Sequence, residues 1–206
     1  LAAVGKAKRT ADMFAGVGTF TFALAPHARV LSLDGDAKAL AALADGARQH
    51  FVLCGSLPPQ DLAVVRTLTA GTPLPYEIVP IDPATGTVAL AAIERCAAVH
   101  ANALAGIVFP QVNSLGCLED VNGCTDLAHR LGVRAIAVID PMLLASGGLK
   151  SPGTFGERGQ GADILVGEGQ HLAIGPNYGG PGLGVFGIRY NATHRHDIRQ
   201  APGRFV

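Results

Sequence analysis

The sequence has no excess of either charge. Its 206 residues hold 16 Lys and Arg against 16 Asp and Glu, and no basic cluster appears. Proteins that bind nucleic acid gather Lys and Arg on one face, so we expect no nucleic-acid partner. Charged residues make up only 16% of the chain and hydrophobic residues 49%. This balance is typical of a parallel sheet buried between helices, and the length suits one domain over residues 1–206.

The chain also lacks the spacings that mark metal-binding cysteines. Cys54, Cys96, Cys117 and Cys124 form no CxxC pair and no Cys–His pair. We therefore expect free thiols in a reduced, cytoplasmic protein. The group His194-Arg195-His196-Asp197 resembles a metal site only superficially, because no further ligand lies near it in the sequence. We expect no metal site.

Long apolar runs and targeting signals are missing as well. No run approaches the ~18 residues of a membrane span, and the N-terminus has no signal-peptide pattern. We therefore expect no membrane partner. The chain begins with Leu1 rather than Met, which suggests a fragment, a processed chain or an engineered one.

Short apolar runs alternate with helical segments along the chain. Predicted strands cover residues 10–15, 30–33, 51–54, 77–80, 105–109, 135–139, 164–166 and 184–188. Predicted helices cover residues 18–25, 36–49, 58–68, 87–97 and 119–131. This alternation predicts an α/β fold with a three-layer, mostly parallel, doubly wound sheet. Pro80 makes the fourth strand short or places it at an edge. The last strand follows a glycine loop without a helix and is expected to run antiparallel.

The first strand leads into a glycine turn that could hold a nucleotide. Gly16 and Gly18 would allow close approach to the backbone at a helix start. Asp34 follows the second strand, at about the ~20-residue spacing of a carboxylate that binds ribose. A tight turn in any α/β protein would give the same G-x-G pattern, so this signal alone is weak.

The residues around this turn are more specific. Thr10-Ala11-Asp12-Met13-Phe14-Ala15-Gly16-Val17-Gly18-Thr19-Phe20-Thr21-Phe22 closely resembles the S-adenosylmethionine motif of class I methyltransferases, above all the RNA uracil-C5 group. The resemblance covers residues 1–45. It implies a Rossmann-like start in which Asp12, Gly16 and Gly18 line the methionine end of S-adenosylmethionine and Asp34 binds its ribose. That group's later D-P-P-R loop and its cysteine nucleophile in a C-N-P context are absent, so no catalyst of methyl transfer is visible.

The remainder, residues 46–206, resembles a different family. Its signatures include Phe109-Pro110-Gln111-Val112-Asn113-Ser114-Leu115-Gly116, Leu118-Glu119-Asp120, Asp140-Pro141, Gly161-Ala162-Asp163-Ile164-Leu165-Val166-Gly167-Glu168-Gly169-Gln170 and Tyr178-Gly179-Gly180-Pro181. These are similar to the glycine decarboxylase P-protein of the glycine cleavage system, specifically to subunit 1 of the split enzyme. The resemblance implies the large domain of a fold-type-I pyridoxal-phosphate enzyme.

In such a domain an Asp at a strand end pairs with the pyridine nitrogen, and a later Lys forms the Schiff base. The resemblance places Asp140 at the Asp position, and Gln170 and His171 where the Lys would stand. Lys150 is the only lysine in the P-protein-like part, and it precedes the strand. Covalent pyridoxal phosphate is therefore not expected. This agrees with subunit 1 as the non-catalytic half, whose partner would be subunit 2, or a second copy if the interface survives.

Two resemblances in one chain suggest a hybrid joined between about residues 34 and 50, or a gene-model artefact. Three functions stay open: a P-protein subunit fragment without turnover of its own, an S-adenosylmethionine-binding module, and a ligand-free structural chimera. Gly179-Gly180-Pro181-Gly182 could be a phosphate nest, although a packing loop is the simpler interpretation. Asp140 could likewise only cap a helix.

Overall fold

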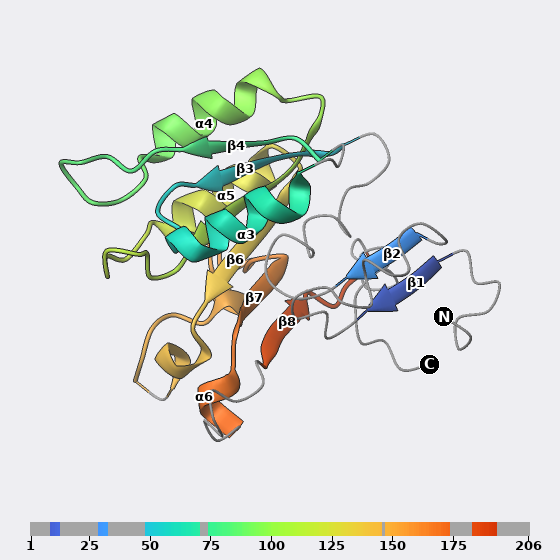
Figure 1. Ribbon diagram of the computed structural model, residues 1–206. Coiled ribbons are helices and arrows are strands. Elements are labelled where there is room, and N and C mark those ends of the chain that lie inside the picture. Colours follow the sequence, from blue (N-terminus) through green and yellow to red (C-terminus); the bar gives the residue numbers. More distant parts are fainter. Residues whose placement is uncertain are drawn as a thin grey trace.

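The computed structural model describes residues 9–12, 29–32, 48–70, 74–145, 147–173 and 183–192. Figure 1 shows the arrangement of its elements. The strands are β1 Arg9–Asp12, β2 Arg29–Ser32, β3 His50–Cys54, β4 Tyr76–Val79, β5 Leu104–Pro110, β6 Arg134–Ile139, β7 Ile164–Glu168 and β8 Gly184–Ile188. The helices are α3 Pro59–Thr69, α4 Leu90–Val99, α5 Val121–Arg130 and α6 Gln170–Ala173, with 3₁₀ turns η1 Pro141–Leu144 and η2 Pro152–Thr154.

Six strands form one mixed sheet in the order β4-β3-β5-β6-β7-β8. The first five run parallel, and β8 pairs antiparallel with β7. The predicted α/β class, the edge position of β4 and the antiparallel last strand are confirmed. β1 and β2 form a separate parallel pair.

Helices cover both faces of the six-stranded sheet, as Figure 1 shows for α3 on one side and α5 on the other. Leu62 and Val65 of α3 pack in one cluster with side chains such as Leu53 and Val108. Side chains of α4 and α5, including Ile93 and Leu127, pack in the other cluster. Because side chains alternate along a strand, the nearly continuous apolar strands fill both layers.

Several predicted boundaries need correction. The helix predicted over 36–49 does not reach its end, because residues 49 and 50 both donate their amides to the Ala103 carbonyl in an extended segment. The helix predicted from 87 starts at Leu90, since Thr87 still bridges to Asp82. Gly132, with φ 66°, ends α5 as predicted. The predicted helix 18–25 lies outside the described residues.

The four cysteines are free, as predicted. Among the described residues, none of the helices is long and apolar enough to cross a membrane.

Candidate functional site

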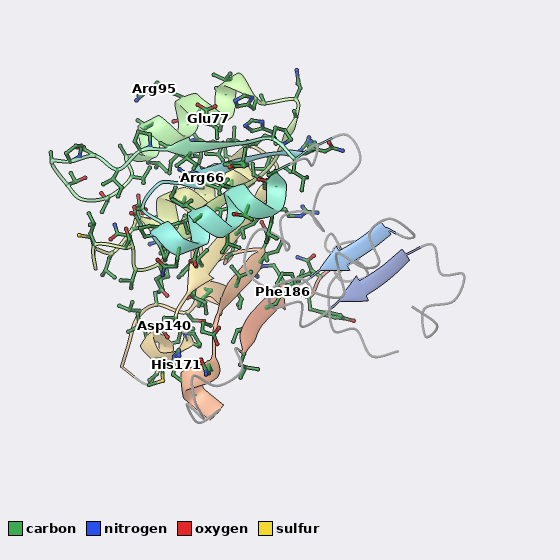
Figure 2. The ribbon with its side chains drawn as sticks, in the orientation of Figure 1. Arg66, Glu77, Arg95, Asp140, His171 and Phe186 are labelled. Atoms are coloured by element: carbon green, nitrogen blue, oxygen red, sulfur yellow. The ribbon has the colours of Figure 1, made fainter. Side chains whose placement is uncertain are left out.

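The carboxyl ends of β6 and β7 bring two predicted site residues together. Because the strands are parallel neighbours, the residues that follow them meet at one edge of the sheet. The His171 Nε2 atom lies 3.1 Å from Asp140 Oδ1, and both side chains are about half exposed. Figure 2 shows the two residues side by side at this edge. The carboxylate and the imidazole can therefore share a proton or a ligand.

Asp140 has a structural role as well. Its Oδ1 accepts a hydrogen bond of 2.9 Å from the Met142 amide and so caps the 3₁₀ turn η1. Pro141 at the first position of this turn has a fixed φ and lacks the amide that would stay unpaired there. The capping role of Asp140 is thus confirmed, while its cofactor role stays a prediction that the contact of the same oxygen with His171 does not test.

Glu168 holds the Gln170 segment in place, a role that the sequence analysis missed. Its Oε1 accepts hydrogen bonds from the amides of Gln170 at 2.7 Å and Leu183 at 2.9 Å. The carboxylate thereby joins the start of α6 to the start of β8. The pattern of a carboxylate before a helix start was visible in the sequence, but its second partner lies 15 residues away.

The glycines around Glu168 fit close backbone packing. A Cβ on Gly167 would collide with the Ile139 carbonyl oxygen, and one on Gly169 would lie 2.8 Å from Val185 Cγ2. These glycines bring β7 close to β6 directly beneath Asp140 and bring the next loop close to β8.

A buried polar network fixes the loop after β5. Asn113 donates to Glu119 Oε1 at 2.8 Å and to the Gly86 carbonyl at 2.7 Å, and its own Oδ1 accepts two loop amides. Glu119 also accepts the Val88 amide. Gln111 Oε1 and Ser56 Oγ are buried without a hydrogen-bond partner among the described residues. The signature residues in the loop after β5 therefore have a largely structural role. Within the described part of the chain, Gln111 Oε1 and Ser56 Oγ are two unpaired polar atoms near the carboxyl ends of the strands.

Lys150, the one lysine of residues 46–206, is engaged elsewhere. Lys150 Nζ donates to Asn122 Oδ1 at 2.7 Å and to the Gly156 carbonyl at 3.3 Å. It lies before β7, as predicted, and no lysine follows it in the sequence. Among the described residues, this edge therefore places Asp140 where a pyridoxal-phosphate site would need a carboxylate, and no lysine beside it.

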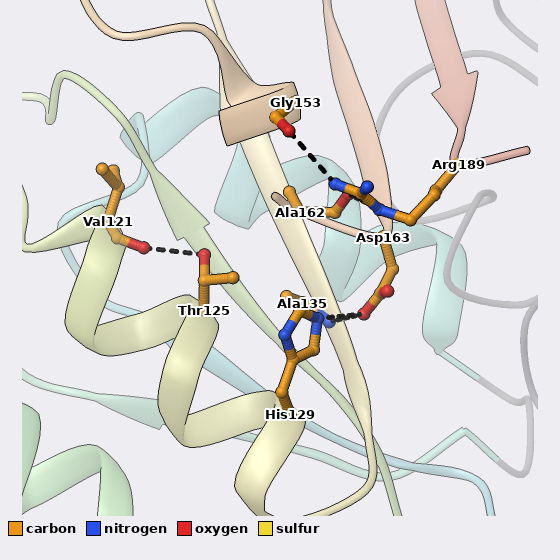
Figure 3. Close-up of polar contacts among 8 residues, drawn as sticks. All are labelled: Val121, Thr125, His129, Ala135, Gly153, Ala162, Asp163 and Arg189. Carbon is orange, nitrogen blue, oxygen red and sulfur yellow. Dashed lines mark hydrogen bonds and ion pairs between the residues drawn. The ribbon is translucent and has the colours of Figure 1, made fainter. Parts of the chain in front are cut away.

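Asp163 of the glycine-rich signature lies at the amino ends of the strands, directly before β7. Its buried carboxylate accepts the Ala135 amide at 2.9 Å and lies 3.2 Å from His129 Nε2. The Arg189 side chain donates to the Ala162 carbonyl (Figure 3). The Arg189 backbone amide donates to the Asp163 carbonyl. These contacts join α5, β6, β7 and the residue after β8, so this part of the signature is structural.

The remaining predicted site residues are not tested by the structure. Asp12 ends β1, where only the backbone is described. Gly16, Gly18, Asp34, the loop 179–182 and the group 194–197 lie outside the described residues. The S-adenosylmethionine cradle therefore stays a prediction.

The comparisons with known proteins agree with the carboxyl-edge signatures. The family described as the glycine cleavage system P-protein matches residues 32–206. The chain belongs to this family. "Probable glycine dehydrogenase (decarboxylating) subunit 1" of Nitrosomonas europaea is 38% identical over 164 residues, which cover 77% of the chain and 34% of that protein. The chain spans about a third of the length of the curated relatives it matches.

Solved structures place the fold in the same group. A glycine decarboxylase P-protein in inhibitor-bound form superposes with a TM-score of 0.62 at 29% identity, covering 81% of this chain and 33% of that one. A pyridoxamine-pyruvate aminotransferase from Mesorhizobium loti gives a TM-score of 0.51 at 15% identity, covering 80% of this chain and 38% of that one. The second likeness concerns the fold alone. The mixed sheet is thus similar to that of fold-type-I pyridoxal-phosphate enzymes.

These comparisons change the interpretation of the N-terminal segment. The P-protein match starts at residue 32, so its range includes residues 34–50. A junction in that interval is therefore not supported, and Asp34 falls within the P-protein match. The methyltransferase resemblance, and with it the inferred chimera, gains no support.

Proposed function

We propose that the chain is part of the subunit-1 half of a glycine decarboxylase and that it works with subunit 2 rather than alone. The P-protein match over residues 32–206 carries this proposal. The identity of 38% to a probable subunit 1 supports the choice of this half. The chain would then shape one side of a shared site.

The positions of the lysines support a non-catalytic role. A Schiff base needs an amine beside the carboxylate that faces the pyridine ring. Next to Asp140 the chain places His171 instead, and Lys150 is tied to Asn122. No step of the reaction is therefore assigned to this chain. Asp140 and His171 would bind and orient groups presented by the partner, and the amine would come from subunit 2.

Exposed apolar side chains support a partner at the same edge. Five of them lie on the segments that follow β5, β6 and β7: Leu115, Leu118, Met142, Leu143 and Leu172. Their exposed fractions range from 38% to 61%. Apolar side chains gathered on neighbouring loops are typical of interfaces, and these would be covered by subunit 2.

Borohydride reduction with pyridoxal phosphate tests the non-catalytic role. The chain alone should acquire no stoichiometric pyridoxyl group, show no aldimine absorbance and release no CO2 from glycine. A chain mixed with the matching subunit 2 should co-purify with it and carry the cofactor on the subunit-2 lysine. Mass spectrometry locates the modified lysine. A single pyridoxyl group on Lys150, or on any other lysine of this chain, would refute the proposal.

A further inference from the structure

Three polar side chains meet at the amino end of β3, away from the Asp140–His171 edge. His50 is the first residue of β3, Glu77 lies on the neighbouring edge strand β4, and His100 caps the end of α4. Figure 2 shows Glu77 between β4 and α4, far from Asp140 and His171. One potential ligand atom of each residue lies within 4.8 Å of those of the other two.

The contacts within this cluster are short. His100 Nε2 lies 2.8 Å from Glu77 Oε2. The rings of His50 and His100 stack with centroids 3.5 Å apart and planes 14° from parallel. Two nitrogens bound to one tetrahedral Zn²⁺, at about 2.0–2.1 Å each, are separated by roughly 3.4 Å. The ligand atoms of the cluster, all within 4.8 Å of one another, thus need to move by about an ångström to reach this separation.

His50 adds an independent observation. It is 7% exposed, and its Nε2 atom is buried without a hydrogen-bond partner among the described residues. A buried polar atom without a partner is uncommon and costs about 1–3 kcal/mol. A ligand that accepts the nitrogen lone pair would remove this cost.

We propose that His50, Glu77 and His100 form a binding site for a divalent transition-metal ion, best matched by Zn²⁺. Two imidazoles and one carboxylate are a ligand set that this ion accepts, with a fourth position left for water or another group. The chain offers one carboxylate and two neutral rings, so the bound ion keeps a net positive charge. The site does not depend on the proposed glycine decarboxylase role.

The two stacked rings must rearrange before both can bind one ion. A nitrogen lone pair lies in the plane of its ring, so an ion held by both rings would tilt them apart from the present 14°. His100 can move, since its side chain is 26% exposed and it stands at a helix end. Glu77 is half exposed and can turn from His100 toward the ion. His50 would stay in place as the buried anchor.

The thiol of Cys96 lies beside the proposed metal site. Cys96 lies on α4, one turn before His100, and its thiol interacts with the Glu77 carboxylate. Burial, and then this carboxylate, raise the pKa of the thiol. The three ligands are 27 and 23 residues apart in sequence, which matches no short metal-binding motif, so no metal site could be predicted from spacing.

Zinc titration of the chelator-treated chain tests the proposal. The variant H194N/H196N is the starting protein, because His194 and His196 could bind metal on their own. Calorimetry should show one Zn²⁺ per chain. Glu77→Gln and His100→Asn should each weaken binding by more than about tenfold, as loss of a ligand or its support does. Glu94→Gln, an exposed carboxylate paired with Arg130, is the matched control and should leave the affinity unchanged.

X-ray absorption of the zinc-loaded chain gives a second readout, with about two nitrogen ligands at roughly 2.0–2.1 Å expected. Both substituted positions are partly exposed, so circular dichroism should show the variants folded. Failure of the H194N/H196N chain to bind zinc would overturn the proposal. So would zinc binding that Glu77→Gln and His100→Asn leave unchanged.

Discussion

The His171 ring lies 3.1 Å from the Asp140 carboxylate, although 31 residues separate them in the sequence. The contact exists because β6 and β7 are parallel neighbours, so Asp140 and the short helix after Glu168 leave the sheet at the same edge. Gly167 strengthens this arrangement, because any side chain there would collide with the Ile139 carbonyl. The P-protein signature residues around Asp140 and those around His171 therefore lie at the same place in the fold.

Replacing Asp140 should affect function more than stability. Its contact with His171 is half exposed, and exposed pairs contribute at most about 1 kcal/mol. Asp140→Asn should therefore shift the urea midpoint little. If the proposed function is correct, glycine-dependent CO2 release by the complex with subunit 2 should fall by about tenfold or more, equal to about 1.4 kcal/mol. Glu94→Gln is the control and should retain activity. Equal activity of the two variants would show that Asp140 only caps the turn.

Replacing Asp163 should lower the stability of the fold. Its carboxylate is buried and accepts the Ala135 amide beside His129. Asp163→Ala leaves the buried amide without an acceptor, which should lower the free energy of unfolding by about 3 kcal/mol. Urea denaturation followed by circular dichroism measures this loss, with Asp140→Ala as the exposed-carboxylate control. A smaller loss for Asp163→Ala than for Asp140→Ala would contradict the structural role of this contact.

The sequence predicted the sheet well because its strands are nearly continuous apolar runs. β5 and β6 differ from their predicted ranges by no more than one residue at each end, and β8 matches its range. Asp140 at the end of β6 was equally predictable, since a Pro follows it and stops the strand. Residues 48 and 49 were assigned to a helix because the Ala-rich pattern before them has no break. Gln49 instead donates its amide to the Ala103 carbonyl, as the first strand residue His50 also does, and local propensity does not reveal this tertiary contact.

Other features depend on contacts between distant residues and could not be predicted. The His50, Glu77 and His100 cluster needs β3 beside β4 and the end of α4 above both. Glu168 needs Leu183 to complete its hydrogen bonds. Asp163 carried a family signature, but the sequence did not separate a structural carboxylate from a site residue. Only its position at the amino edge of the sheet makes that distinction.

The buried His50 should make stability depend on pH. Burial, and then the charge of His100, lower the pKa of His50 below 6.5, although Glu77 acts in the opposite direction. The unfolded chain therefore binds a proton at a higher pH than the folded one, so stability should fall as the pH drops below about 6.5. His50→Phe keeps the aromatic ring and removes the titration, and it should flatten the pH dependence of the urea midpoint. These measurements require a chelator. An unchanged pH dependence in His50→Phe would contradict this origin.

Cys96 should be unusually slow to react with alkylating reagents. Burial, followed by the charge and the hydrogen bond of Glu77, raises the pKa of its thiol from 9.0 to about 11. Because the thiolate is the reactive form, two pKa units reduce its fraction at neutral pH by roughly 100-fold. Iodoacetamide labelling of the chelator-treated chain, mapped by mass spectrometry, should show Cys96 labelled far more slowly than an added small thiol. Glu77→Gln should restore only part of the rate, because burial, the largest cause, remains. Labelling of Cys96 as fast as the small thiol would show that neither burial nor Glu77 holds it protonated.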